Sequence, residues 1–246
     1  MIAFILSLTL RELVSRKSTL LLLGLAAIPP IIALIFRLSD PSDVNPERWT
    51  ARVLFIGLMV TAVLPLTALL FGTTVIGDEI EDGTAVYLLT KPVPRWQILL
   101  PKLTAAWIMT CALLLPSTLI AGFLALNGRG DSAIVLGFAV AVPVGALAYN
   151  TVFVMLSVVT SRALIAGLIY VFIWEGAITG IFAGTRYMSI RHYTIGIAGW
   201  IADPKPLTFD PYVGSTAAIV LIAVVTLVAG LVANRRLQRL EVREST

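Results

Sequence analysis

The sequence predicts an all-α integral membrane protein, with six transmembrane helices that form a single domain over residues 1–246. Composition supports this fold class, because 58% of the residues are hydrophobic and only 13% are charged. Apolar runs of about 18 residues or more, the length that crosses a bilayer as a helix, recur along the chain. These runs exclude a soluble domain with a large core.

The predicted spans follow from the apolar runs and from the polar stretches between them. Residues 1–17 form an amphipathic helix with a basic end, which is typical of a helix that lies in the membrane interface. The run 133–183 is too long for one span, so we divide it at Thr160-Ser161-Arg162. The spans are expected at about 18–37, 53–76, 98–126, 133–159, 163–183 and 213–233.

Residues 185–212 are predicted as an external loop that contains a short helix. Ser189 is placed to cap the start of this helix, and the prolines of DPKP (203–206) end it. Apolar residues recur between these signals at helical spacing, namely Ile190, Tyr193, Ile197 and Trp200.

Basic residues predict the orientation of the chain. Six spans place both termini on one side, and eleven of the 18 Lys and Arg residues lie on that side. Cytoplasmic loops carry an excess of Lys and Arg, so both termini and the segment 77–102 are expected in the cytoplasm. The chain is then a multi-pass protein of the cell membrane, inner or plasma, and its net charge of +4 requires no nucleic-acid partner.

Four carboxylates gather just after the second predicted span, at Asp78, Glu79, Glu81 and Asp82. Successive residues of a helix point about 100° apart, so these side chains cannot all converge on one ion or one substrate. They are also expected to face water, where a carboxylate has no unusual reactivity. The following residues instead predict a cytoplasmic helix over 78–90, with an apolar face and a double-proline stop, of the kind that docks to a partner.

A spaced motif in this region resembles the cytoplasmic loop of permease subunits of type-2 ABC exporters. The motif is Glu-x-x-x-Gly-Thr-x-x-x-Leu-Leu-x-x-Pro-x-x-Arg-x-x-x-x-x-x-Lys. Its positions are met by Glu79, Gly83, Thr84, Leu88, Leu89, Pro92, Arg95 and Lys102. The six spans, the interfacial N-terminal helix and the short external helices before span six are similar to that family as well.

The resemblance implies that residues 78–90 form a coupling helix seated on a separate ATPase subunit. The implied docking residues are Asp78, Glu79, Glu81, Asp82, Gly83, Thr84, Tyr87, Leu88, Lys91 and Arg95. The sequence contains no G-x-x-x-x-G-K-[ST] loop, so ATP and Mg are expected on the partner and no cofactor on this chain. The family also implies a second permease, either another copy or a related chain, and export of a hydrophobic or amphipathic substrate.

Glu175 lies about 13 residues into span five, or about 20 Å deep. An intramembrane carboxylate invites a functional hypothesis, and three remain open: a hydrogen bond to the external helix or a neighbouring span, a role in substrate passage or gating, and proton coupling. Gly176, Gly180 and Gly184 follow at four-residue spacing and allow close approach of another helix. In the resembled family, Trp174-Glu175 is a familiar pair and span five contributes to the dimer contact.

Other features of the sequence predict neither catalysis nor a metal site in this chain. His192 is the only histidine and Cys111 the only cysteine, so no metal site is expected. The alternatives to an ATP-driven permease are an intramembrane enzyme and a secondary transporter or channel that works without ATP. An enzyme needs several converging polar groups at membrane depth, and the second class commonly shows internal repeats, which we do not find.

Overall fold

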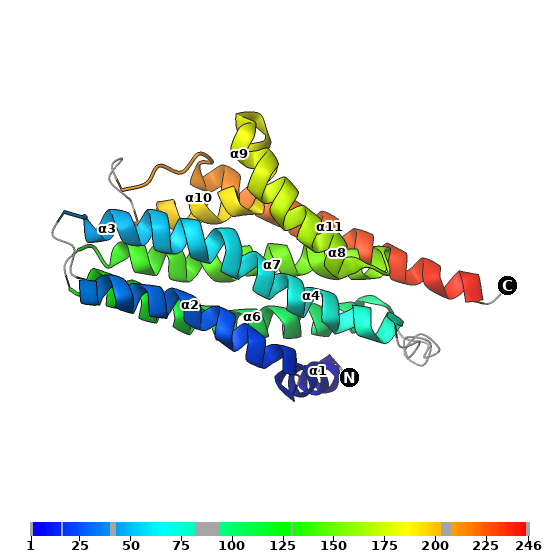
Figure 1. The fold of residues 1–246 in the computed structure, drawn as a ribbon. Helices are drawn as coiled ribbons and strands as arrows, with labels where there is room; N and C mark the ends of the chain where they lie inside the picture. Colours follow the sequence, from blue (N-terminus) through cyan, green and yellow to red (C-terminus); the bar gives the residue numbers. More distant parts are fainter. Residues whose placement is uncertain are drawn as a thin grey trace.

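The computed structural model describes residues 2–15, 17–39, 43–81, 94–128, 130–202 and 208–244, and every regular element in these ranges is helical (Figure 1). The helices are α1 (Ile2–Ser15), α2 (Lys17–Ser39), α3 (Pro46–Trp49), η1 (Thr50–Val63), α4 (Leu64–Glu81), α6 (Trp96–Leu126), α7 (Ala133–Val159), α8 (Ala163–Ile169), η2 (Tyr170–Ile178), α9 (Thr179–Ile181), η3 (Ala183–Met188), α10 (Ile190–Ala202) and α11 (Ser215–Glu244).

Within the described ranges, six stretches of helix are long and apolar enough to cross a membrane, which confirms the predicted fold class. They are Ser18–Ser39, Pro46–Gly77, Trp96–Leu126, Ala133–Val159, Ala163–Ile181 and Ser215–Gln238. The first, fifth and sixth are the least buried, at 28%, 22% and 22%. These three spans therefore offer most of their surface to lipid or to other chains.

The helix α7 occupies the centre of the bundle and packs against α4, α6, α10 and α11 (Figure 1). Its inward side chains Phe138, Tyr149 and Phe153 are fully buried and form the middle of the larger apolar core. Phe55 of span two packs on Phe138, with ring centroids 4.7 Å apart. Span four, formed by α7, is thus the central helix of the bundle, and α4, α6, α10 and α11 pack around it.

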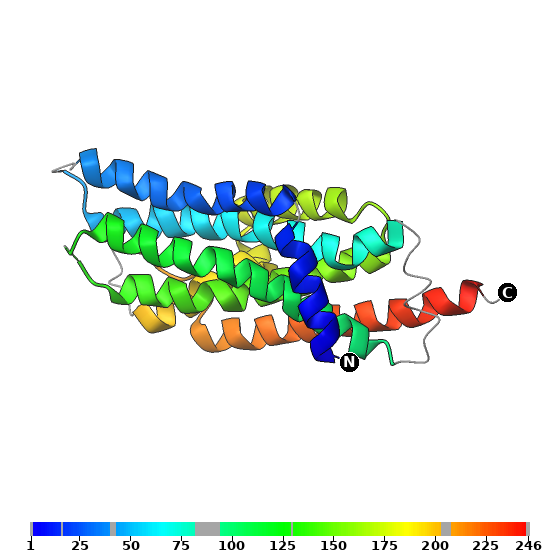
Figure 2. The same ribbon diagram turned by 90° about the horizontal axis from the view of Figure 1, so that it is seen from below.

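Both chain ends lie at the same end of the bundle, where α1 crosses the long axis of the other helices (Figure 2). A second apolar core seals this end and includes Leu13 of α1, Leu22 of α2, Leu103 of α6 and Leu237 of α11. Exposed apolar side chains such as Phe4 (69% exposed) and Leu8 (58% exposed) lie on the opposite face of α1. This arrangement fits a helix that lies in the membrane interface.

Span two is longer than the sequence predicted at both of its ends. It begins with Asn45, whose side-chain oxygen accepts a hydrogen bond from the Arg48 N–H at 3.1 Å, and with Pro46 at the first helical position. At the other end α4 continues through Glu81. The backbone of Asp78–Glu81 therefore continues the helix of span two instead of beginning a separate one.

Two membrane segments, η1 in span two and η2 in span five, are wound as π-helices. The Leu64 N–H donates to the Met59 carbonyl, and the Thr179 N–H donates to the Trp174 carbonyl, each five residues back. Such wider turns are rare in proteins, and those that do occur are often found at functional sites. Here they change which side chains share a face, because residues five apart become neighbours.

A hydroxyl on span three donates a hydrogen bond to a backbone carbonyl that a proline leaves without a donor in span one. Pro30 lies inside α2 and has no N–H, so the carbonyl of Ala26, four residues earlier, loses its helical donor. The Ser117 hydroxyl on α6 donates to this carbonyl at 2.6 Å. A kinked helix is tolerated in a membrane because a neighbouring helix satisfies the freed backbone group.

Replacing Ser117 by Ala is expected to lower the free energy of unfolding by about 0.6–1.5 kcal/mol, because the Ala26 carbonyl then has no donor. Denaturation in mixed micelles measures the change. The matched control is Ser39→Ala, since the exposed Ser39 hydroxyl donates within its own helix, to the Ile35 carbonyl. Equal stability of the two variants would contradict a stabilising role for the hydrogen bond from Ser117 to Ala26.

The short helix predicted within 185–212 is present as α10, and Ser189 caps it, accepting a hydrogen bond from the His192 N–H at 3.3 Å. The helix packs along the first half of α7 and against α11, so it is part of the bundle. Glycine permits this approach, because a Cβ at Gly137 of α7 would lie 2.7 Å from the Ala198 carbonyl oxygen.

Candidate functional site

The carboxylate of Glu175 joins span five to the start of α10. Its side chain is only 3% exposed and accepts three hydrogen bonds. The donors are the Tyr170 hydroxyl at 3.0 Å, the Ile190 N–H at 2.9 Å and the Ser189 hydroxyl. We call Tyr170, Glu175, Ser189 and Ile190 the Glu175 junction.

The position of this carboxylate follows from the electrostatics of a helix start. The first N–H groups of a helix have no partner inside the helix and carry a partial positive charge. Ser189 satisfies the N–H of His192, and Glu175 satisfies that of Ile190. The structure therefore bears out the structural hypothesis for Glu175, a hydrogen bond to the loop helix. The gating and proton-coupling hypotheses stay predictions.

Tyr170 could not be recognised as a partner of Glu175 from an α-helical reading of the sequence. Residues five apart on an α-helix point about 140° away from each other. In the π-helix η2 they lie on one face, and the Tyr170 hydroxyl reaches Glu175. The sequence does contain a tyrosine hydroxyl five residues before the intramembrane acid. This spacing indicates a contact only if the helix is known to be π-helical at this point.

Further hydrogen bonds fasten the end of span five to the segment before α10. The Trp174 indole N–H donates to the Met188 carbonyl at 3.2 Å, and the Arg186 Nε–H donates to the Thr179 carbonyl at 3.3 Å. Trp174 thus has a structural contact of its own beside Glu175. The short helix η3 connects these bonds, so span five and the start of α10 are expected to move together.

Gly176, Gly180 and Gly184 are exposed, and the described part of the chain does not pack against them closely. A Cβ at Gly180 or Gly184 would meet no atom within 4 Å. Large apolar side chains flank them, with Phe172 at 62% and Ile181 at 74% exposure. The predicted close helix approach does not occur inside one chain, so this face is left for lipid or for another chain.

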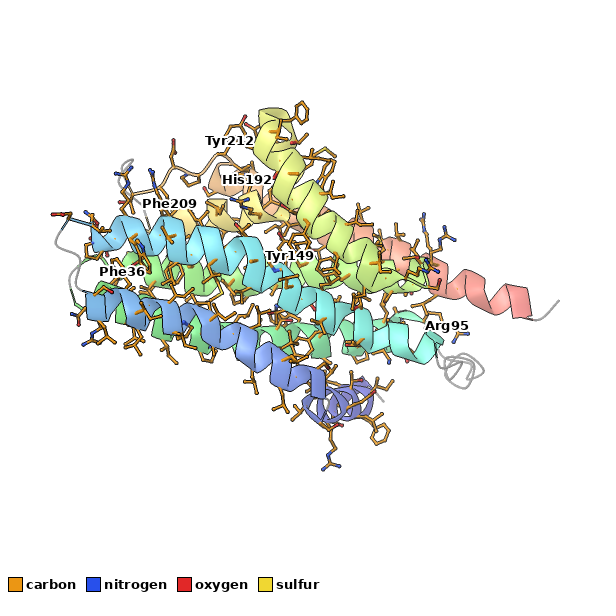
Figure 3. The ribbon with its side chains drawn as sticks, in the orientation of Figure 1. Phe36, Arg95, Tyr149, His192, Phe209 and Tyr212 are labelled. Atoms are coloured by element: carbon orange, nitrogen blue, oxygen red, sulfur yellow. The ribbon has the colours of Figure 1, made fainter. Side chains whose placement is uncertain are left out.

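The predicted docking segment is described only at its two edges. Asp78, Glu79 and Glu81 belong to the last turns of α4. Asp82, Gly83, Thr84, Tyr87, Leu88 and Lys91 lie outside the described residues. Description resumes at Pro94, and the side chain of Arg95, just before α6, is 5% exposed (Figure 3).

Lys102 ties α6 to α4 near this segment. Its side chain is 3% exposed, and its ammonium group donates to the Val75 carbonyl at 2.8 Å. A buried ammonium group is costly unless it is hydrogen-bonded, so this contact fixes the start of span three against the end of span two. The arrangement can carry a displacement at one of these helix ends to the other.

His192 lies on α10 beside an aromatic ring, with its ring centroid 6.3 Å from that of Tyr212 (Figure 3). Burial and the nearby guanidinium groups of Arg191 and Arg186 lower the pKa of His192 to about 4. The residue is therefore neutral near pH 7. No group of three potential metal ligands occurs in the described ranges.

Comparison with known proteins agrees with this architecture. The model of a family described as ABC-2 family transporter protein matches residues 15–239. A search of curated proteins finds no match. The matched region holds all six membrane-crossing helices, the Glu175 junction and the segment between α4 and α6. The chain therefore belongs to the ABC-2 family of transporter proteins, as a membrane permease.

Proposed function

We propose that the chain is the membrane subunit of an exporter driven by ATP hydrolysis on a separate nucleotide-binding subunit. The observation that carries this proposal is the family match over residues 15–239 together with six membrane-crossing helices. ATP and Mg would bind to the partner subunit. A tagged permease, extracted in mild detergent, is expected to co-purify with a nucleotide-hydrolysing subunit; its purification without any such subunit would count against the proposal.

The segment between α4 and α6 is proposed to receive the ATPase subunit. The helix α4 ends with the acidic residues Asp78, Glu79 and Glu81, directly after its apolar stretch. The Lys102 bond to the Val75 carbonyl links the two helices that border this segment. Movement of the ATPase would then displace spans two and three together and open the pathway.

The exposed face of span five is proposed to contact a second permease, either another copy or a related chain. Span five is only 22% buried, and Gly180 leaves open space where a neighbouring backbone would fit. The alternative occupant of this face is lipid. The test must therefore separate chain-to-chain packing from lipid contact.

Gly180→Leu is expected to shift the permease toward single chains, because a leucine side chain would fill the space used by a neighbouring helix. Size-exclusion chromatography with light scattering measures the mass of the complex. Gly24→Leu is the matched control, since a Cβ there also meets nothing within 4 Å but lies on span one. An unchanged mass for Gly180→Leu would remove span five from the dimer contact.

Both termini are proposed to face the cytoplasm, as the excess of basic residues on their side indicates. Cys111 is the only cysteine, so its replacement by Ala allows a single reporter cysteine to be added at the C-terminus. A membrane-impermeant maleimide is expected to label this reporter only after the cells are opened. Labelling of intact cells would reverse the orientation.

The cargo is proposed to be hydrophobic or amphipathic, since the face of span five proposed to meet the second permease exposes apolar and aromatic side chains such as Phe172 and Ile181. Nothing in the Glu175 junction favours an intramembrane enzyme, because the carboxylate already accepts three hydrogen bonds. Stimulation of ATP hydrolysis by amphiphiles, but not by small polar solutes, is the expected result. The reverse selectivity would contradict this cargo class.

A further inference from the structure

Two arginines, a histidine and two tyrosines gather where η3 meets α10. The guanidinium carbon of Arg186 lies 5.1 Å from the centre of the Tyr212 ring. The Tyr212 ring is 5.3 Å from that of Tyr187 and 6.3 Å from that of His192. We call Arg186, Tyr187, Arg191, His192 and Tyr212 the cationic cluster, of which Figure 3 labels His192 and Tyr212.

The positive charge of the cluster lies on Arg186 and Arg191, which both act on the His192 ring. Arg186 donates its Nε–H to the Thr179 carbonyl, and the Nε of Arg191 is buried without a hydrogen-bond acceptor among the described residues. The hydrogen bonds that the nearby Glu175 carboxylate accepts from side chains and from Ile190 come from neutral groups and not from a guanidinium group of the described residues. A buried guanidinium N–H without an acceptor is costly, so an acceptor from outside the described chain would be stabilising.

The cluster is open enough to receive such a group. Tyr187 and Tyr212 are 50% and 42% exposed, while Phe182 and Met188 at the two ends of η3 are 61% and 65% exposed. His192 is neutral near pH 7, because its pKa is lowered to about 4, so the charge resides on the two guanidinium groups. Guanidinium groups bind phosphate and carboxylate through paired hydrogen bonds.

We propose that the cationic cluster binds the phosphate or carboxylate headgroup of an amphiphile. Arg186 and Arg191 hold the headgroup, the tyrosine rings border it, and the exposed apolar side chains of η3 contact the alkyl chain. The amphiphile is either an anionic membrane lipid or the exported cargo. Only the second source rests on the proposed function, where it narrows the cargo to anionic amphiphiles.

Equilibrium binding of labelled dodecyl phosphate to the full permease in phosphatidylcholine nanodiscs tests this proposal. Empty nanodiscs supply the background, and dodecanol is the neutral ligand with the same chain. Arg186→Gln/Arg191→Gln is expected to weaken saturable binding at least about tenfold, because two charge-assisted contacts are lost. Arg162→Gln, an exposed arginine in the turn before α8, is expected to leave it unchanged.

Equal binding to the wild type and to the double variant, or equal saturable binding of dodecanol, would overturn the proposal. If the double variant does not fold, a competition experiment on the wild type tests the proposal instead. Inorganic phosphate is expected to compete with dodecyl phosphate for binding, and a failure to compete would overturn the proposal. Replacing part of the phosphatidylcholine by phosphatidylglycerol separates the sources. Competition identifies a lipid headgroup, and unchanged affinity identifies a single-chain, cargo-like ligand.

The assay contains no ATPase subunit and no nucleotide, so its result is independent of ATP-driven transport. Binding without any effect on hydrolysis in the complete complex would retain the site and reject its role in export. Loss of binding with intact ATP coupling would reject the site and retain the proposed function.

Discussion

Replacing Glu175 by Leu is expected to destabilise the permease by about 3 kcal/mol or more and to abolish transport. The change removes the acceptor of three hydrogen bonds and leaves the Ile190 N–H and the Ser189 hydroxyl buried without their partner. Each hydrogen bond to a charged group contributes about 1.5–3 kcal/mol, although such contributions do not simply add. Denaturation in mixed micelles and transport in proteoliposomes measure the two effects.

Glu175→Gln separates a structural role from proton coupling. The glutamine keeps an oxygen acceptor for the Ile190 N–H, and its amide can donate to the Ser189 hydroxyl, so we expect a loss of about 1 kcal/mol and retained transport. A carboxyl group that carries a proton during transport cannot be replaced by an amide. Full stability of Glu175→Gln with loss of transport would contradict the structural role and support proton coupling.

Changing Asp78, Glu79, Glu81 and Asp82 together to Ala is expected to uncouple transport from ATP hydrolysis while membrane insertion stays intact. These acids end α4 and begin the segment proposed to meet the ATPase, so their loss removes the charges of the docking surface without altering the apolar spans. We expect transport to fall at least about tenfold, as for loss of charged contacts at an interface. Transport and hydrolysis are measured on the same proteoliposomes.

Asp210→Ala is the control for general effects of charge, since Asp210 is exposed and lies in the loop before α11, far along the chain from the docking segment. It is expected to behave as the wild type. Normal transport and normal stimulation of hydrolysis in the four-acid variant would show that the acidic turn does not dock to the ATPase.

The sequence predicted the six spans because crossing a bilayer requires long apolar helices, and such runs are visible without any knowledge of packing. Span two was predicted too short, since Glu47, Arg48 and Arg52 indicated a loop. The helix nevertheless begins at Pro46, where Asn45 supplies a cap. Local capping chemistry here extends a helix past its apolar stretch.

The position of α10 could not be obtained from periodicity. Three residues of the noted repeat, Ile190, Tyr193 and Ile197, are buried, but Trp200 is 64% exposed. In the second half of the helix the contact residues are Ala198 and Ala202, which approach Gly137 of α7, and Trp200 points to the opposite side. Only the path of the neighbouring helix determines this change of face.

Glu175 was singled out correctly from the sequence because a carboxylate inside an apolar span requires partners. Its partners were not all predictable. Ser189 was recognised as a helix cap, whereas Tyr170 required the π-helical winding of η2. The glycines after Glu175 were predicted to allow close approach of another helix because they are small. No helix of the described chain makes this approach at Gly180 or Gly184.

Mg-ATP hydrolysis by the purified ATPase subunit, with and without this permease in nanodiscs, tests the central claim most directly. The proposed coupling predicts that incorporation of the permease changes the hydrolysis rate several-fold, and that the four-acid variant of residues 78–82 leaves the rate near that of the ATPase alone. Identical hydrolysis with the wild-type permease, with the four-acid variant and without any permease would contradict it.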